Sequence, residues 1–166
     1  MGGLLRIFEP PRRCPMQLTI EIAAYYTQDA DSVFQSALHF SEMTDAMAGL
    51  ATYEGLPDHG TAREGDTLIV DVTFWGWFKQ TGHIMHIERL DPEARVIQSR
   101  ESGNGIRRWD HTLSVQSDGA KTRWTDAVVL DAGWRTPFVA IFAAYMYRCR
   151  HRYRKAESVS VRFFRA

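Results

Sequence analysis

The sequence predicts one α+β domain, in which a curved antiparallel sheet wraps around a long C-terminal helix and two short helices follow the first strand. Three observations lead to this fold class. Five consecutive strand-like segments are separated by tight turn signals, which is typical of antiparallel hairpins. One helical segment then runs from Thr136 to about Glu157, and its length of roughly 30 Å is enough to cross a small sheet. Two short helical segments lie between the first strand and the hairpins.

The first part of the chain supplies the opening strand and both short helices. Gln17–Tyr26 alternates apolar residues with polar or small ones, as a strand with one buried face does. Asp29 or Asp31 can cap a helix that runs to Leu38, because a short acidic side chain accepts from the free N–H groups of the first turn. A second short helix is expected from about residue 41 to residue 49.

The hairpins predict which residues share the inner face of the sheet. The expected strands span residues 66–75, 78–90, 95–101, 106–116 and 121–131. Side chains alternate between the two faces of a strand, so the turns fix the partners across each hairpin. A two-residue turn at Asp118-Gly119 places His111 opposite Asp126 and Leu113 opposite Trp124. The polar groups expected on the inner face are His83, Gln98, Arg100, His111 and Asp126.

The long helix is expected to cover this face. Pro137 suits its first turn, where a missing N–H is not needed. Its expected apolar stripe is Phe138, Ile141, Phe142, Tyr145, Cys149 and Tyr153. A curved sheet around one helix can leave a cavity, and an apolar cavity with a few polar groups is typical of a small-molecule site. The expected apolar lining is Met85, Trp109, Leu113, Trp124, Phe142 and Tyr145.

Composition limits the function classes. The 166 residues include 20 basic and 20 acidic side chains, so no overall field attracts nucleic acid. The two cysteines, Cys14 and Cys149, give no disulfide framework, which favours a reducing cytoplasm. The start lacks a signal-peptide pattern, and Met16 is an alternative first residue. We expect a tail over 1–16, the domain over 17–158, and a tail or a strand over 159–166.

Three segments carry a resemblance to a known family. They are the Tyr25–Phe34 segment after the first strand, the Leu90–Arg95 turn, and the Trp124-Thr125-Asp126 strand that leads into the last helix. With the order of elements, they make residues 17–156 resemble the START/Bet v 1-like superfamily, which includes polyketide cyclase/dehydrase and lipid-transport proteins. The resemblance implies a helix-grip fold with a hydrophobic cavity between sheet and helix. It implies lipids, polyketides, sterol-like or aromatic compounds as ligands, and no catalytic residue is carried over.

His111 and Asp126 have two interpretations. A carboxylate beside a histidine fixes its tautomer and raises its basicity, which suits general acid–base chemistry. The alternative is a buried polar pair that satisfies its own hydrogen bonds, with Gln98 as a further partner.

Other polar residues also have two interpretations each. Arg100 with Trp109 can hold a ligand carboxylate, or Arg100 can simply extend to water at the rim. The basic run Arg148–Lys155 can touch an anionic membrane surface, or form a solvated helix face. His83 and His86 resemble a metal motif, but three residues along a strand put them on opposite faces.

The sequence therefore predicts a protein that binds a small hydrophobic molecule, with no metal, cofactor or nucleic acid. The alternative is a cyclase- or aromatase-like enzyme that moves protons with His111 and Asp126. A third alternative is an interaction protein whose sheet–helix interior is filled.

Overall fold

The computed structural model describes residues 16–57 and 59–165. The elements in chain order are β1 (Gln17–Tyr26), α1 (Ala30–Leu38), α2 (Phe40–Ala46), β2 (Ala51–Glu54), β3 (Thr67–Phe74), β4 (Phe78–Asp91), β5 (Val96–Gly103), β6 (Ile106–Asp118), β7 (Lys121–Asp131), the 3-10 turn η1 (Gly133–Arg135), α3 (Thr136–Tyr153) and β8 (Ser158–Arg165). Asp29 caps α1 as predicted, since its Oδ1 accepts from the Ser32 N–H at 2.9 Å. The predicted tail up to residue 15, with Cys14, lies outside these residues.

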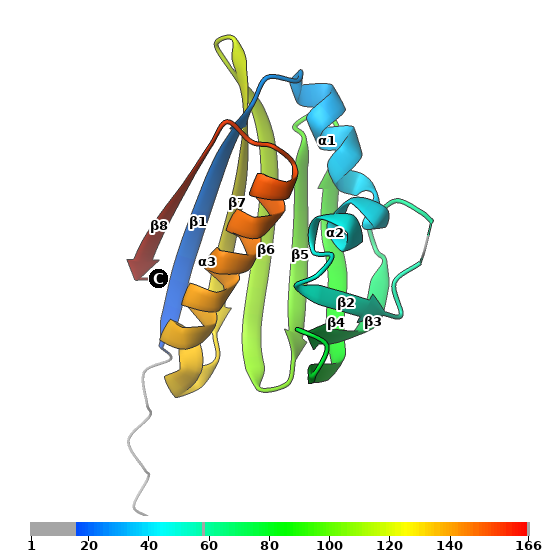
Figure 1. The fold of residues 1–166 in the computed structure, drawn as a ribbon, viewed down its shortest axis with the longest axis vertical. Coiled ribbons are helices and arrows are strands. Elements are labelled where there is room, and N and C mark those ends of the chain that lie inside the picture. The colour runs from blue at the N-terminus through cyan, green and yellow to red at the C-terminus, as the bar shows by residue number, and fades with distance from the viewer. Residues whose placement is uncertain (1–15, 58, 166) are drawn as a thin grey trace, which may run out of the picture.

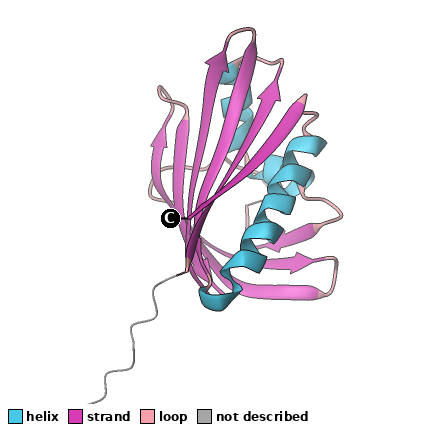
Figure 2. Cartoon of the chain, turned by 90° about the vertical axis from the view of Figure 1, so that its left-hand side faces the viewer, coloured by secondary structure: helices cyan, strands magenta, loops and turns pink. Residues whose placement is uncertain are grey.

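The strands form one antiparallel sheet in the order β2-β3-β4-β5-β6-β7-β1-β8. Figures 1 and 2 show that the sheet curves and that α3 lies across its concave side. The predicted helix-grip fold, with two short helices after the first strand, is confirmed. Of the two alternatives for the C-terminal segment, the structure shows a strand, because β8 pairs with β1 along its length. None of the helices in the described ranges is both long and apolar enough to span a membrane.

The β6–β7 hairpin differs from the predicted register by two residues. Asp118 pairs with Lys121, so Gly119 and Ala120 make the turn. Gly119 takes a positive φ of 62°, which favours a turn one residue later than predicted. Leu113 therefore lies opposite Asp126, and His111 opposite Val128. The predicted pairs were wrong, but a two-residue shift keeps every side chain on its predicted face.

The side chains of β5 lie on the opposite faces of the sheet from those predicted. A bulge on each side, at Glu88 in β4 and at Arg107–Arg108 in β6, shifts its register by one residue. Ser99 and Glu101 therefore face inward. The prediction that Gln98 and Arg100 lie on the inner face was wrong for this reason. Gly103 helps to set this local geometry, because a Cβ there would lie 2.9 Å from the Gly82 carbonyl oxygen.

The helix α3 presents the opposite face from the one predicted. Its buried face is built from small and polar residues: Thr136, Ala140, Ala143, Ala144, Arg150 and His151. The small side chains let α3 pack closely on Ile20, Ile22 and Val128. Four of the six residues in the predicted stripe are exposed: Phe138, Ile141, Tyr145 and Tyr153. Tyr145 is 49% exposed, so its predicted place in the cavity was wrong.

Candidate functional site

A cavity of about 190 Å³ lies between the inner face of the sheet, α2 and α3. Its apolar lining is Met43, Met47, Val72, Phe74, Met85, Ile106, Trp109, Val139, Phe142 and Met146. Its polar lining is Tyr53, Gln80, His83, Glu101, Asn104, His111, Arg135, Tyr147 and Arg150. The exposed Asn104 and the half-buried Arg135 are among the lining residues, so we place the mouth beside the β5–β6 turn and η1.

The structure brings together about half of the predicted site residues. Those that line the cavity are His83, Met85, Trp109, His111 and Phe142. Leu113 and Trp124 are instead core residues packed against α1. Asp126 is fully buried behind His111 and does not line the cavity. Gln98 and Arg100 lie on the outer face, where the Arg100 Nε donates to Glu88 at 2.7 Å.

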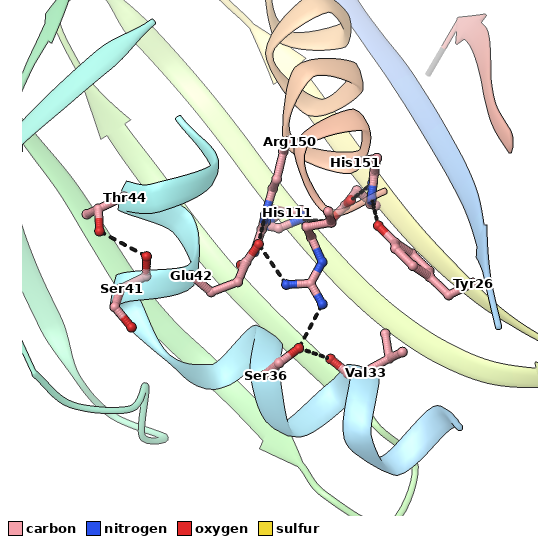
Figure 3. A network of polar contacts seen from close by, with 11 residues as sticks. Tyr26, Val33, Ser36, Ser41, Glu42, Thr44, His111, Arg150 and His151 are labelled. Carbon is pink, nitrogen blue, oxygen red and sulfur yellow. Dashed lines mark hydrogen bonds and ion pairs between the residues drawn. The ribbon is translucent and has the colours of Figure 1, made fainter. Parts of the chain in front are cut away.

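A chain of hydrogen bonds runs from the cavity wall into the core. The His111 Nε2 lies 2.8 Å from Asp126 Oδ1, and the His151 Nε2 lies 2.9 Å from Asp126 Oδ2. The Tyr26 hydroxyl lies 2.6 Å from the His151 Nδ1. Figure 3 shows Tyr26 beside His151 at the C-terminal end of α3. The chain links β1, β6, β7 and α3, and only His111 meets the cavity.

The charge state of Asp126 fixes the tautomers along this chain. Burial alone raises the pKa of a carboxyl, but the hydrogen bonds from His111 and His151 outweigh it and hold the pKa of Asp126 far below its ordinary value. An ionised carboxylate only accepts hydrogen bonds, so both Nε2 atoms carry protons. Tyr26 then donates to the His151 Nδ1, and its phenol pKa is raised to about 12, chiefly by burial. The His111 Nδ1 makes no hydrogen bond with the residues that the structure describes.

A second polar cluster lies on the same sheet wall, on the neighbouring strands β4 and β5. Glu101 accepts from the His83 Nε2 at 2.9 Å and from the Ser99 hydroxyl at 2.7 Å. Both His83 and Glu101 line the cavity. His86 lies on the other face, where its Nδ1 is 2.9 Å from the Thr67 hydroxyl. Among the residues that the structure describes, no group of three His, Cys, Asp or Glu side chains has the arrangement of a metal site.

Two of the five Arg and Lys residues in the basic run Arg148–Lys155 turn inward. Arg150 lines the cavity and donates through Nη2 to Glu42, and Arg154 donates to the same carboxylate at 2.9 Å. Figure 3 shows Glu42 reaching from α2 to Arg150. The guanidinium groups of Arg150 and Arg154 also stack on Trp124, at 4.8 and 4.6 Å from its ring centre. The interpretation of the run as a solvated face was wrong for these two arginines.

Burial and charge act in opposite directions on this ion-pair cluster. Burial is the largest influence on the pKa of Glu42 and raises it, yet Arg150 and Arg154 together hold that pKa below its ordinary value. Glu42 is therefore ionised at neutral pH, and it compensates a buried positive charge beside the cavity.

Sequence reasoning missed His151, Tyr26, Glu42, Arg150 and Tyr147. A usable signal was present for part of this set. Ala140, Ala143 and Ala144 are followed by Tyr147 and His151 at helical spacing, and together they mark the buried face of α3. Burial raises the pKa of Tyr147 well above its ordinary value, and Asp126 and Glu101 add to this effect. Tyr147 therefore stays protonated and keeps a hydroxyl group at the cavity wall.

Comparison with known proteins supports the fold. No protein-family model matches the sequence. No curated protein matches it either. The solved structure of TTHA0849 from Thermus thermophilus is similar at a TM-score of 0.56 and 11% identity, over 81% of this chain and 95% of that one. Ara h 8.0201 is similar at a TM-score of 0.60 and 11% identity, over 82% of this chain and 97% of that one. These likenesses support a Bet v 1-like fold.

Proposed function

We propose that this helix-grip domain binds a small, mainly apolar molecule in the cavity between the sheet and α3. The observation that carries the proposal is the cavity itself, about 190 Å³ in volume, with aromatic and methionine side chains around a few convergent polar groups. Such a lining is typical of small-molecule sites. A filled interior, the third alternative from the sequence, does not fit a cavity of this volume.

The volume narrows the class of ligand. It exceeds the roughly 150 Å³ of an engineered apolar cavity that holds benzene. It is below the roughly 300–1,000 Å³ of pockets for drug-sized molecules. We therefore favour a compound with one or two rings, or a short acyl chain, over a sterol or a long-chain lipid. A small aromatic compound is the leading candidate.

Binding is tested with a panel of small aromatic compounds, titrated by calorimetry into the wild type and two variants. Met85→Trp fills the cavity from β4, whereas Ile84→Trp adds the same side chain to the neighbouring residue on the outer face. We expect the wild type and Ile84→Trp to bind and Met85→Trp to lose binding while it stays folded. Equal binding by a folded Met85→Trp would place the ligand elsewhere.

A second candidate function, general acid–base catalysis, is favoured by the His111 Nδ1, which makes no hydrogen bond within the described part of the chain. The ring of His111 lines the cavity, and Asp126 holds its other nitrogen at 2.8 Å. A carboxylate in this place orients the imidazole and stabilises its protonated form. A cyclase- or aromatase-like reaction needs such a group to remove a proton beside a carbonyl.

This second function is tested by proton exchange on 2-tetralone, a two-ring ketone, in deuterium oxide. A competent base removes a proton beside the carbonyl and returns a deuteron, which NMR detects without any other reaction. We expect the wild type to accelerate exchange and a folded His111→Ala variant to lose the acceleration. Equal rates for both proteins would assign the His111–Asp126 pair a structural role.

A transport role through contact with an anionic membrane surface is supported by the outer side of α3. Arg148 and Arg152 are exposed there, with Lys155 exposed just after the helix, and the helix also carries exposed apolar residues. Vesicles of phosphatidylglycerol should sediment the protein at low salt, and phosphatidylcholine vesicles should not. Replacing the three cations with Gln should weaken this binding, whereas Arg162→Gln on β8 should not. No sedimentation with the anionic vesicles would reject the contact.

A further inference from the structure

We infer that the ligand is a monocarboxylate whose anionic group is bound by Arg135 at the cavity mouth. The inference rests on the proposed function and names the chemical class that the same cavity accepts. It also replaces Arg100, the residue that the sequence suggested for a carboxylate, since Arg100 points away from the cavity and pairs with Glu88.

The ionisable side chains that line the cavity have polar or charged partners, with one exception. Arg150 shares the Glu42 carboxylate with Arg154, while Glu101 accepts from His83 and Ser99. Asp126 accepts from two histidines behind the wall. Within residues 16–57 and 59–165, Arg135 makes no ion pair, and its Nη2 donates only to the main-chain oxygen of Asn104, at 3.2 Å. Among the described residues, Arg135 is therefore the lining arginine without a carboxylate partner.

The local backbone holds Arg135 at the mouth. Its turn, η1, is fixed by Thr136, whose hydroxyl accepts from the Ala132 N–H at 2.8 Å and donates to the Gly133 carbonyl at 2.7 Å. Gly105 leaves space for the guanidinium, because a Cβ at this position would collide with Nη2. The side chain thus crosses from η1 to the β5–β6 turn. An arginine fixed in this way presents several N–H donors to a carboxylate.

A second, independent observation points to a ligand oxygen. Trp109 is only 8% exposed, lines the cavity, and has a buried Nε1 with no hydrogen-bond partner among the described residues. Tyr147 is close enough for the indole to influence its pKa, but the pair does not reach the geometry of a hydrogen bond. A buried donor without an acceptor is unfavourable, and a bound acceptor removes that penalty. Trp109 therefore offers the cavity a spare donor, while the lining carboxylate, Glu101, already accepts from His83 and Ser99.

One lining arginine without a carboxylate partner among the described residues favours a monoanion over a dianion. A phosphate monoester carries nearly two negative charges at neutral pH, and one arginine cannot compensate both. The apolar residues Phe74, Met85 and Phe142 then surround the rest of the molecule. The ligand class that fits is an aromatic or short-chain acyl monocarboxylate.

The test compares acids with their neutral amides of nearly equal shape: benzoate with benzamide, 4-phenylbutyrate with 4-phenylbutyramide, and 2-naphthoate with 2-naphthamide. Calorimetry measures each affinity for the wild type, Arg135→Gln and Arg107→Gln. Arg107 is the matched control, because it is an exposed arginine beside Gly133 that does not line the cavity. Phenyl phosphate serves as the dianionic probe.

We expect the wild type and Arg107→Gln to prefer the best acid over its amide by roughly ten- to a hundredfold, the size of a charge-assisted hydrogen bond. Arg135→Gln should lose this preference and keep its affinity for the amide. Phenyl phosphate should bind no more tightly than benzoate. Equal binding of acid and amide by the wild type, or a preference that survives Arg135→Gln, would overturn the inference while leaving the proposed function intact. Failure of every acid and amide to bind would overturn both.

Discussion

The Glu42 ion-pair cluster gives the sharpest test of how α2 and α3 are held together. Glu42→Gln removes the carboxylate charge between Arg150 and Arg154 but keeps the size of the side chain. Its side chain is 10% exposed and that of Arg150 is 9% exposed, so the arginine charge stays buried without compensation. Breaking a buried pair on one side typically destabilises by about 3–5 kcal/mol. We expect about 3 kcal/mol, the lower value, because the amide oxygen of Gln still accepts one hydrogen bond.

The matched control is Glu54→Gln, which breaks an exposed pair with Lys79. The two side chains of this pair are 70% and 45% exposed, and such pairs contribute about 0–1 kcal/mol. Each kcal/mol lowers the Tm of a domain of this size by about 2–4 °C. Thermal unfolding should therefore show a fall of about 6–12 °C for Glu42→Gln and of less than about 4 °C for Glu54→Gln. Equal falls in the two variants would refute the view that burial makes the Glu42 pair strong.

Three further predictions concern the pKa of Asp126, the pKa values of two tyrosines, and the backbone at Gly103. Ionised Asp126 should stabilise the fold relative to Asp126→Asn, and this effect should be complete above about pH 4. The effect should be lost as the pH falls toward the depressed pKa of Asp126 in the folded protein. A stability difference that does not fall at low pH would contradict this prediction. The pKa values of Tyr26 and Tyr53 are raised to about 12 in the folded protein, so both should stay protonated at pH 11 in an ultraviolet titration. Their contribution to stability should fall as the pH rises from about 10 to 12. Ionisation of every tyrosine below pH 11 in the folded protein would refute this prediction. Gly103 has a φ of 137° and lies against the Gly82 backbone, so Gly103→Ala should destabilise the fold by about 2–3 kcal/mol. Gly119 has a φ of 62° and open space around it, so Gly119→Ala should destabilise by about 1 kcal/mol. Similar losses of stability for the two variants in urea unfolding would count against the close approach of Gly103 to Gly82.

The sequence was informative wherever the two-residue period of a strand determined the outcome. His111 and Asp126 were assigned to the inner face, and the register shift of two residues in their hairpin left that assignment intact. The same reasoning placed Gln98 and Arg100 on the wrong face, because each bulge beside β5 inserts one extra residue. A register shift of one residue moves every side chain to the other face of the sheet. The extra residues, such as Glu88, have no distinctive sequence signal.

The prediction of the buried face of α3 was wrong for a different reason. Large apolar residues such as Phe138 and Ile141 suggested a buried stripe, but apolar residues are common on protein surfaces. The inner face of the sheet already carries the bulky side chains of Trp109, Trp124 and Leu113, and α3 packs on the sheet with alanines. His151 lies on that alanine face, and it could be assigned only once the face was known.

The measurement that most directly tests ligand binding in the cavity is NMR of protein labelled with ¹³C at the methionine methyl groups. Four of the six methionines line the cavity: Met43, Met47, Met85 and Met146. Met16 is exposed just before β1 and serves as an internal control. On titration with 2-naphthoate and with 2-naphthamide, we predict saturable shifts of the four cavity methyl signals and an unchanged Met16 signal. Unchanged cavity signals with both compounds, or the largest shift at Met16, would contradict a ligand site between the sheet and α3.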